Sequence, residues 1–336
     1  MTNILLVFTG GTIGSQLENG TIDTHHAAGF KLIELFRAAY ASHAEIQFHT
    51  LQPIQILSEN QHPHAWQQII TVIEKEDLST FDGIIVTHGT DTLAFSAAAF
   101  GIYFNGLDIP MLLVSSDLPL DNPNANGLNN FLCAVEYIRQ NRQPGVFVPY
   151  QNPGGAMHVH IGTRLSSCLS LSSDFISVQN KPYLTFAQGN FEPHHPTSVQ
   201  TDNGHRLKPK FARILLIRPY PGLDYGHFNL DNIDVVLHDL YHSGTACVSQ
   251  QWGEQHSLIA FSRRCQQQNI PLYLAPAIQS ESAYSSTKEM LAHGAKIIWN
   301  TSIETAHAKL ALAYGNLSES LNIEEFLTKD IAREKV

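Results

Sequence analysis

The sequence has few cysteines, few basic residues and no long hydrophobic run, and each shortage excludes a class of protein. The four cysteines have no C-x-x-C spacing, which argues against a disulfide framework and a thiolate zinc site. Lys and Arg number 20 against 30 Asp and Glu, a net charge of −10, so we expect no nucleic-acid partner. No apolar run approaches the roughly 20 residues of a membrane span and the N-terminus shows no leader pattern, so we expect a cytoplasmic protein without a membrane partner.

Histidine is abundant, with 18 residues, but its arrangement does not favour a metal site. The pairs His25-His26 and His194-His195 are adjacent in sequence, and adjacent side chains diverge in any regular element. No H-E-x-x-H motif is present. We therefore expect no metal ligands and interpret these histidines as solvent-facing loop residues.

Short apolar runs alternate with segments of helical spacing along the whole chain. This alternation predicts the α/β class, with a larger N-terminal doubly wound parallel sheet and a smaller C-terminal α/β domain. A length of 336 residues suits two domains, which we place at 1–190 and 211–336 with a Pro-rich linker at 191–210. The polar stretch 20–29 predicts a loop that closes over the first strand as a lid.

Two of the predicted strands end in polar, glycine-containing turns. The run Leu5-Leu6-Val7-Phe8 stops at Thr9-Gly10-Gly11-Thr12, and the strand Gly83–Thr87 stops at His88-Gly89-Thr90-Asp91-Thr92. Right-handed crossovers should bring the carboxyl ends of both strands to the same edge of the sheet, where open α/β sheets bind ligands. Thr12 is thus a candidate nucleophile, with Thr90, Asp91 and backbone N–H groups facing it.

Each turn also has an explanation without catalysis. Thr12 can cap a turn or helix, and Asp91 or Thr90 can act as the N-cap of the helix that starts at Leu93. A dinucleotide site is excluded, because Gly10-Gly11-Thr12-Ile13-Gly14 lacks the G-x-G-x-x-G spacing.

Taken together, T-G-G-T-I and H-G-T-D-T resemble the two signature stretches of the L-asparaginase family, closest to its cytoplasmic type. The resemblance extends over nearly the whole chain, through Ser58 before Trp66, the stretch Val114–Leu120, Tyr220-Pro221-Gly222 and Ser243-Gly244-Thr245.

This resemblance implies an amidohydrolase that converts L-asparagine, or a related small amide, to aspartate and ammonia without a cofactor. Thr12, Thr90 and Asp91 would be catalytic: Thr12 as the nucleophile, Thr90 as activator of water or nucleophile, and Asp91 as the group that holds the substrate ammonium. Ser58 would bind the α-carboxylate. Glu59, Gly89 and Gly11 complete the implied substrate-binding set.

The resemblance also implies a homodimer or homotetramer. A residue of one protomer would complete the pocket of its neighbour, and Tyr284 and Lys288 lie near the segment that would contribute it. The expected partners are therefore a small amide and further copies of this chain.

The sequence departs from the family pattern at three positions. The family has a lysine shortly after the arginine that matches Arg164, whereas this chain has Ser167 and Cys168 there, and Lys181 is too distant to be assumed equivalent. Cys168 is a candidate substitute for the lysine, or simply a small buried hydrophobe. In the lid, Thr21 stands where the family usually has a tyrosine.

Glu59, beside Ser58, is the third departure. Ionised in the pocket, it would repel an α-carboxylate or recognise an ammonium, and in solvent it would do neither. The alternative to the enzyme is a non-catalytic protein of the same fold that binds a small amino-acid-like ligand.

Overall fold

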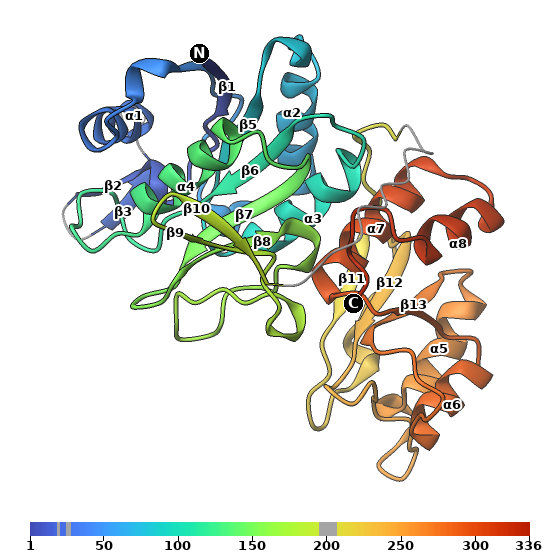
Figure 1. The fold of residues 1–336 in the computed structure, drawn as a ribbon. Coiled ribbons are helices and arrows are strands. Elements are labelled where there is room, and N and C mark those ends of the chain that lie inside the picture. Colours follow the sequence, from blue (N-terminus) through green and yellow to red (C-terminus); the bar gives the residue numbers. More distant parts are fainter. Residues whose placement is uncertain (19–20, 25–27, 195–206) are drawn as a thin grey trace. The chain divides into compact units, whose positions relative to one another are not determined.

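The computed structural model divides the chain into two units, each described separately (Figure 1). The N-terminal unit comprises Met1–Pro209 with Ile331–Arg333, and the C-terminal unit comprises Lys210–Asp330 with Glu334–Val336. The structure describes residues 1–18, 21–24, 28–194 and 207–336. Most of the stretch expected as a linker, 195–206, lies outside these ranges, and a short strand, β10 (Asn190–Pro193), occupies its beginning.

The N-terminal unit contains an eight-stranded sheet of order β10-β9-β8-β7-β6-β5-β1-β4. Its parallel half contains β4, β1, β5, β6 and β7. The runs of apolar residues in β1, β5 and β6 are typical of strands covered on both faces, whereas the edge strand β4 contains polar, exposed residues. The bounds are β1 (Thr2–Val7), β4 (Ile46–Leu51), β5 (Gly83–Thr87), β6 (Pro110–Val114) and β7 (Gly145–Gln151).

The other half of this sheet is antiparallel. Strand β8 (Met157–Ile161) pairs with β7, β9 (Leu184–Ala187) pairs with β8, and β10 pairs with β9, each in antiparallel fashion. The sequence predicted only parallel strands, so this half of the sheet is an addition to the predicted architecture.

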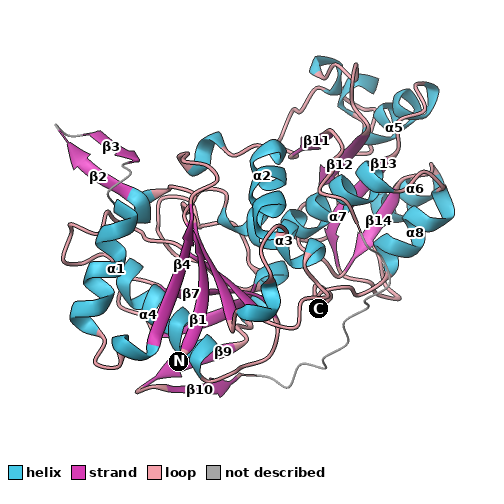
Figure 2. Ribbon diagram, turned by 90° about the horizontal axis from the view of Figure 1, so that it is seen from above, coloured by secondary structure: helices cyan, strands magenta, loops and turns pink. Residues whose placement is uncertain are grey.

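Helices cover both faces of the parallel half, as a doubly wound sheet requires (Figure 2). Helices α1 (Ala28–Ala39) and α4 (Gly127–Arg139) lie on one face, where Phe36 and Phe131 pack in one apolar cluster with Ile4 and Leu6. Helices α2 (Pro63–Ile73) and α3 (Leu93–Tyr103) lie on the other face. The α/β class predicted from the sequence is confirmed.

The segment predicted as a lid loop contains secondary structure. Strands β2 (Ser15–Glu18) and β3 (Thr21–Thr24) pair in an antiparallel hairpin, so the prediction of a loop without elements over 20–29 is wrong. Residues 19–20 and 25–27, and the side chain of Thr21, lie outside the described part of the chain.

The C-terminal unit contains a four-stranded parallel sheet of order β11-β12-β13-β14. Its strands are β11 (Ile214–Ile217), β12 (Val235–Asp239), β13 (Leu272–Ala277) and β14 (Lys296–Trp299). Its helices are α5 (Leu258–Gln267), α6 (Ser285–Ala292), α7 (Ile303–Asn316) and α8 (Ser320–Thr328). Among the described residues of both units, no helix combines the length and apolarity needed to cross a bilayer.

The C-terminal tail contributes to both units. In the N-terminal unit, the Thr163 hydroxyl donates to the Ala332 carbonyl at 2.8 Å, and Arg164 donates to the Arg333 carbonyl. In the C-terminal unit, the fully buried Lys309 ammonium lies 2.6 Å from the Glu334 carboxylate. The last residues of the chain are therefore structural parts of both cores.

Candidate active site

Strands β1 and β5 are parallel neighbours, so the turns that follow them emerge at the same edge of the sheet. The chain runs from β1 to β4 on one side and then to β5 on the other, which places this edge at a topological switch point. Two hydrogen bonds connect the strand ends: the Thr9 N–H donates to the Thr87 hydroxyl at 3.2 Å, and the Thr9 hydroxyl donates to the Thr87 carbonyl at 2.5 Å. The predicted common edge is confirmed.

Gly11 brings the two turns into direct backbone contact. Its φ of +75° is a conformation that side chains disfavour, and a Cβ built on it would lie 2.2 Å from the Gly89 nitrogen. A Cβ on Gly89 would in turn lie 2.4 Å from the Ser58 hydroxyl oxygen. Only glycine at both positions permits this approach, and the approach holds the turns that carry Thr12 and Thr90 together.

A third segment, before helix α2, completes the cluster. The Gly11 N–H donates to the Ile56 carbonyl at 2.9 Å, and Ser58, in a short 3-10 turn, is buried. The Ser58 hydroxyl donates to an Asp91 carboxylate oxygen at 3.1 Å and accepts from the Asp91 N–H at 3.2 Å. Ser58 therefore holds both the backbone and the side chain of Asp91.

The N-cap interpretation of Asp91 and Thr90 is wrong. Helix α3 begins at Leu93, and its N-cap position is occupied by Thr92, whose hydroxyl donates to the Ser58 carbonyl at 2.9 Å instead of capping the helix. The Asp91 carboxylate is bound to Ser58 and exposed, so it remains accessible to a cationic group.

The remaining predicted site residues are less closely connected. Thr12 begins a 3-10 turn (Thr12–Gly14) and is half-buried. Glu59 follows Ser58 in the same 3-10 turn, but it is exposed. Tyr284 and Lys288, at the start of α6, belong to the C-terminal unit.

Cys168 lies within electrostatic range of Asp91, which the sequence could not show. Burial, followed by the Asp174 and Asp91 carboxylates, raises the pKa of the Cys168 thiol, and the thiol donates to the Ser172 carbonyl at 3.5 Å. A neutral thiol contributes no positive charge beside Asp91. Lys181 is exposed and donates to Gln179 at 2.7 Å.

His88, the first residue after β5, is a buried residue that the sequence analysis did not single out. Its Nδ1 lies 2.7 Å from the Gly89 carbonyl oxygen. Burial lowers the pKa of its imidazole, so the ring is neutral near pH 7. Its position in the H-G-T-D-T turn, directly after an apolar strand, was the available signal.

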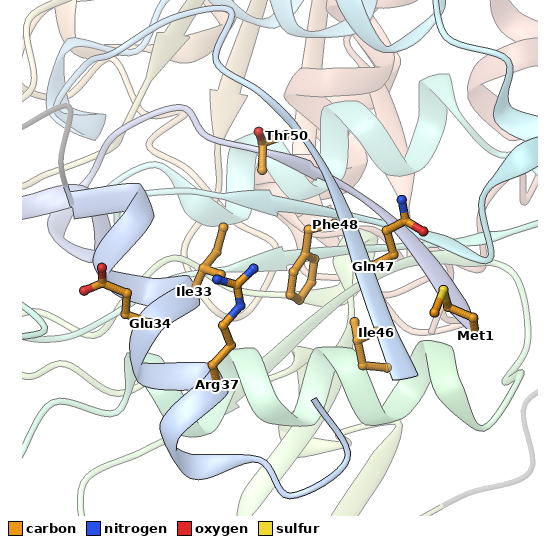
Figure 3. Close-up of a pocket in the computed structure, with 8 residues that line it drawn as sticks. All are labelled: Met1, Ile33, Glu34, Arg37, Ile46, Gln47, Phe48 and Thr50. Carbon is orange, nitrogen blue, oxygen red and sulfur yellow. The ribbon is translucent and has the colours of Figure 1, made fainter. Parts of the chain in front are cut away.

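A separate hollow of about 470 Å³ lies along the edge strand β4 and helix α1 (Figure 3). Phe48 and Ile33 lie between the strand and the helix, and Arg37 and Glu34 extend from α1. None of its lining residues belongs to the turns after β1 and β5. In the described part of the chain, no group of three or more His, Cys, Asp or Glu side chains is placed to hold a metal ion.

Comparison with known proteins identified similar sequences and structures. The chain is 26% identical to a component of the glutamyl-tRNA(Gln) amidotransferase of Methanococcus maripaludis, over 99% of this chain and 81% of that one. The corresponding component from Aeropyrum pernix is also 26% identical, over 98% and 79%. The L-asparaginase structure from Thermococcus kodakarensis matches with a TM-score of 0.80 at 22% identity, over 100% and 99%, and L-asparaginase I from Vibrio cholerae matches with 0.80 at 19%, over 100% and 99%.

These relatives correct the expected partner set. We expected a small amide and further copies of the chain, with no nucleic acid, but both sequence relatives are components of an enzyme named for a tRNA. The expectation is wrong because net charge describes only the surface of this chain, whereas one component can serve a tRNA-directed assembly with an acidic surface of its own.

The family model described as "Asparaginase, N-terminal" matches residues 3–197, which include both glycine turns, Ser58 and all of the eight-stranded sheet of the N-terminal unit except Thr2. The structural likenesses extend the same fold over the second unit. The chain therefore belongs to the asparaginase family.

Proposed function

We propose that the protein hydrolyses the side-chain amide of L-asparagine or a related small amide, with Thr12 as the nucleophile. The Thr12 hydroxyl would attack the amide carbonyl carbon, the C–N bond would break as ammonia leaves, and water would hydrolyse the threonyl ester to aspartate. Thr90 would position the water or the nucleophile, and Asp91 would bind the substrate ammonium.

The observation that carries the proposal is the backbone contact between Gly11 and Gly89. It brings the turns that contain Thr12, Thr90 and Asp91 to one strand-end edge, where a hydroxyl would serve as the nucleophile and backbone N–H groups would stabilise a developing oxyanion. Ser58 supports the assignment of Asp91, because its hydroxyl donates to the Asp91 carboxylate and accepts from the Asp91 N–H, which together orient the carboxylate for recognition of a cation.

Ammonia release from asparagine, glutamine and other small amides tests the proposal in the wild type and in Thr12→Ala and Thr90→Ala. We expect release by the wild type and loss of at least about 1000-fold in Thr12→Ala, with Thr12→Ser retaining a measurable fraction. No release from any amide, together with a melting temperature raised by aspartate, would reject catalysis in favour of the ligand-binding alternative.

The names of the sequence relatives favour a second candidate, in which this chain is the ammonia-releasing component of an amidotransferase that acts on glutamyl-tRNA(Gln). Ammonia release measured with and without glutamyl-tRNA(Gln) and cell extract separates the two candidates. Stimulation that requires the charged tRNA supports the amidotransferase role, and an unchanged rate supports a free-standing hydrolase. The cytoplasmic location stays a prediction.

A further inference from the structure

Two buried polar atoms lie at the ends of neighbouring strands beside the proposed site. Thr87 pairs in register with Val114, and the His88 N–H donates to the Val114 carbonyl at 2.9 Å, so His88 and Ser115 are the next residues of β5 and β6. In-register neighbours in a parallel sheet direct their side chains to the same face. Both side chains are buried, and neither His88 Nε2 nor Ser115 Oγ has a hydrogen-bond partner among the described residues.

The bond on the opposite side of the ring fixes what Nε2 requires. A carbonyl oxygen only accepts, so His88 Nδ1 must carry the proton that it donates to Gly89 at 2.7 Å. Since burial keeps the ring neutral, Nε2 is an acceptor and needs a donor. The Ser115 hydroxyl is a donor on the adjacent strand, beyond direct hydrogen-bonding distance, and one bridging water would satisfy both atoms.

We propose that His88 and Ser115 are positioning residues for the proposed hydrolysis. The Ser115 hydroxyl, through one buried water, holds His88 as the Nδ1–H tautomer, and that N–H holds the Gly89 carbonyl in place. The inference rests on the proposed function, because its effect falls on the Gly89–Thr90 peptide unit between the two proposed catalytic turns.

Fixing the Gly89 carbonyl also fixes the next N–H. In a trans peptide the C=O and N–H vectors are opposed, so a Gly89 carbonyl directed at His88 directs the Thr90 N–H away from it. The Thr90 N–H makes no hydrogen bond with the described residues. It is therefore free to donate to the oxyanion that forms when the amide carbonyl is attacked.

Two pairs of variants separate positioning from simple packing. Asn places an N–H donor where His has Nδ1, whereas Gln places its amide where His has Nε2. We expect His88→Asn to retain kcat within about 5-fold and His88→Gln to lose about 100-fold, with KM changed less than about 2-fold in both. Ser115→Ala should lose about 10-fold in kcat, and Ser115→Thr should restore it. Equal losses in His88→Asn and His88→Gln would overturn the proposal.

A second measurement does not require activity. Nitrogen NMR of the wild type labelled at histidine, with the His88 signals assigned by their loss in His88→Asn, reports the tautomer directly. We expect Nδ1–H with an unprotonated Nε2 near pH 7, and a shifted Nε2 resonance in Ser115→Ala. An Nε2–H tautomer, or an Nε2 resonance indifferent to Ser115→Ala, would overturn the inference. A wild type that releases no ammonia would instead reject the proposed function, and the NMR result would still decide the His88–Ser115 contact.

Discussion

In each unit, parallel strands end at the carboxyl edge of the sheet, where open α/β sheets bind ligands, yet the two edges have different chemistry. After β1 and β5, glycines allow backbone contact between the two turns, and a serine hydroxyl binds a carboxylate. After β11 and β12, prolines and aromatic rings form a hollow of about 310 Å³, lined in part by Tyr220, Tyr241 and Trp252. The strand topology is parallel in both, so the few residues after each strand decide the chemistry of the edge.

The carboxylates at the two edges differ in whether a positively charged side chain lies beside them. Asp91 is held by a neutral hydroxyl, which leaves its charge available to a ligand. Asp239, at the end of β12, lies 3.6 Å from the Arg218 guanidinium, which partly neutralises it. An edge with an available carboxylate suits a cationic substrate, whereas an edge with a paired carboxylate does not.

The largest expected effect comes from adding one methyl group at the edge after β1 and β5, with the same change at the other edge as the control. Gly11→Ala places a Cβ against the Gly89 backbone, so we expect ammonia release to fall at least about 100-fold and the free energy of unfolding to fall by more than about 3 kcal/mol. Gly222→Ala is the matched control: Gly222 also has a positive φ, of +82°, but its Cβ would meet nothing within 4 Å. It should cost about 1 kcal/mol and leave ammonia release unchanged. Similar losses in both variants would contradict the role given to the Gly11–Gly89 contact.

Neutralising one carboxylate at each edge is the next test. Asp91→Asn removes the charge proposed to bind the substrate ammonium, so KM should rise about 10- to 100-fold, as expected for loss of a charged hydrogen bond. Asp239→Asn changes a carboxylate at the other edge and should leave both kcat and KM unchanged. Steady-state kinetics of ammonia release measure both, and an unchanged KM in Asp91→Asn would remove Asp91 from substrate binding.

Acid should destabilise both units through buried histidines. Burial lowers the pKa of His160 in the N-terminal unit to about 3 and that of His238 in the C-terminal unit to about 4. Below the unfolded histidine pKa of about 6.5, the unfolded chain binds more protons than the folded chain. The free energy of unfolding is therefore greatest above about pH 7 and falls as the pH decreases toward 4.

Each of these histidines should cost about 2 kcal/mol at pH 5 relative to pH 7. Urea unfolding at the two pH values measures the difference. His238→Gln retains an amide near the Tyr225 hydroxyl, which lies 2.8 Å from His238 Nε2, but cannot be protonated. The variant should lose less stability in acid than the wild type, and an equal loss would assign the effect to other groups.

The smallest effect is expected at the aromatic hollow. The Trp252 side chain is 76% exposed, so Trp252→Ala should change the free energy of unfolding by less than about 0.5 kcal/mol and leave ammonia release unchanged. Thermal unfolding and the ammonia assay measure this. A change in KM would show that the two edges do not act independently.

The sequence predicted the strands that carry the site, because buried parallel strands are short apolar runs ended by polar, glycine-containing turns. The strand Gly83–Thr87 matches its predicted bounds residue for residue. Strands β8 and β9 were missed, because β8 reads Met-His-Val-His-Ile and β9 only Leu-Thr-Phe-Ala, neither of which gives a continuous apolar run.

The site was predictable as a meeting of two turns but not as a set of bonds. Right-handed crossovers between parallel strands bring their carboxyl ends to the same edge, so Thr12 and Thr90 could be placed at one edge before the direct pairing of β1 with β5 was known. The bond from Ser58 to Asp91 joins residues 33 apart in sequence and depends on how the 3-10 turn before α2 packs. The proximity of Cys168 to Asp91 likewise arises from tertiary packing, which no local pattern encodes.

The tail of the chain limits how this protein can be divided for engineering. Because 331–333 belong to the N-terminal unit and 334–336 to the C-terminal unit, a fragment that ends at residue 209 lacks the Ala332 and Arg333 carbonyls that Thr163 and Arg164 bind. A fragment that starts at residue 210 keeps Glu334 beside Lys309 but carries three residues that belong to the missing half. A split reporter would therefore need residues 331–333 supplied with its first half and residues 334–336 with its second.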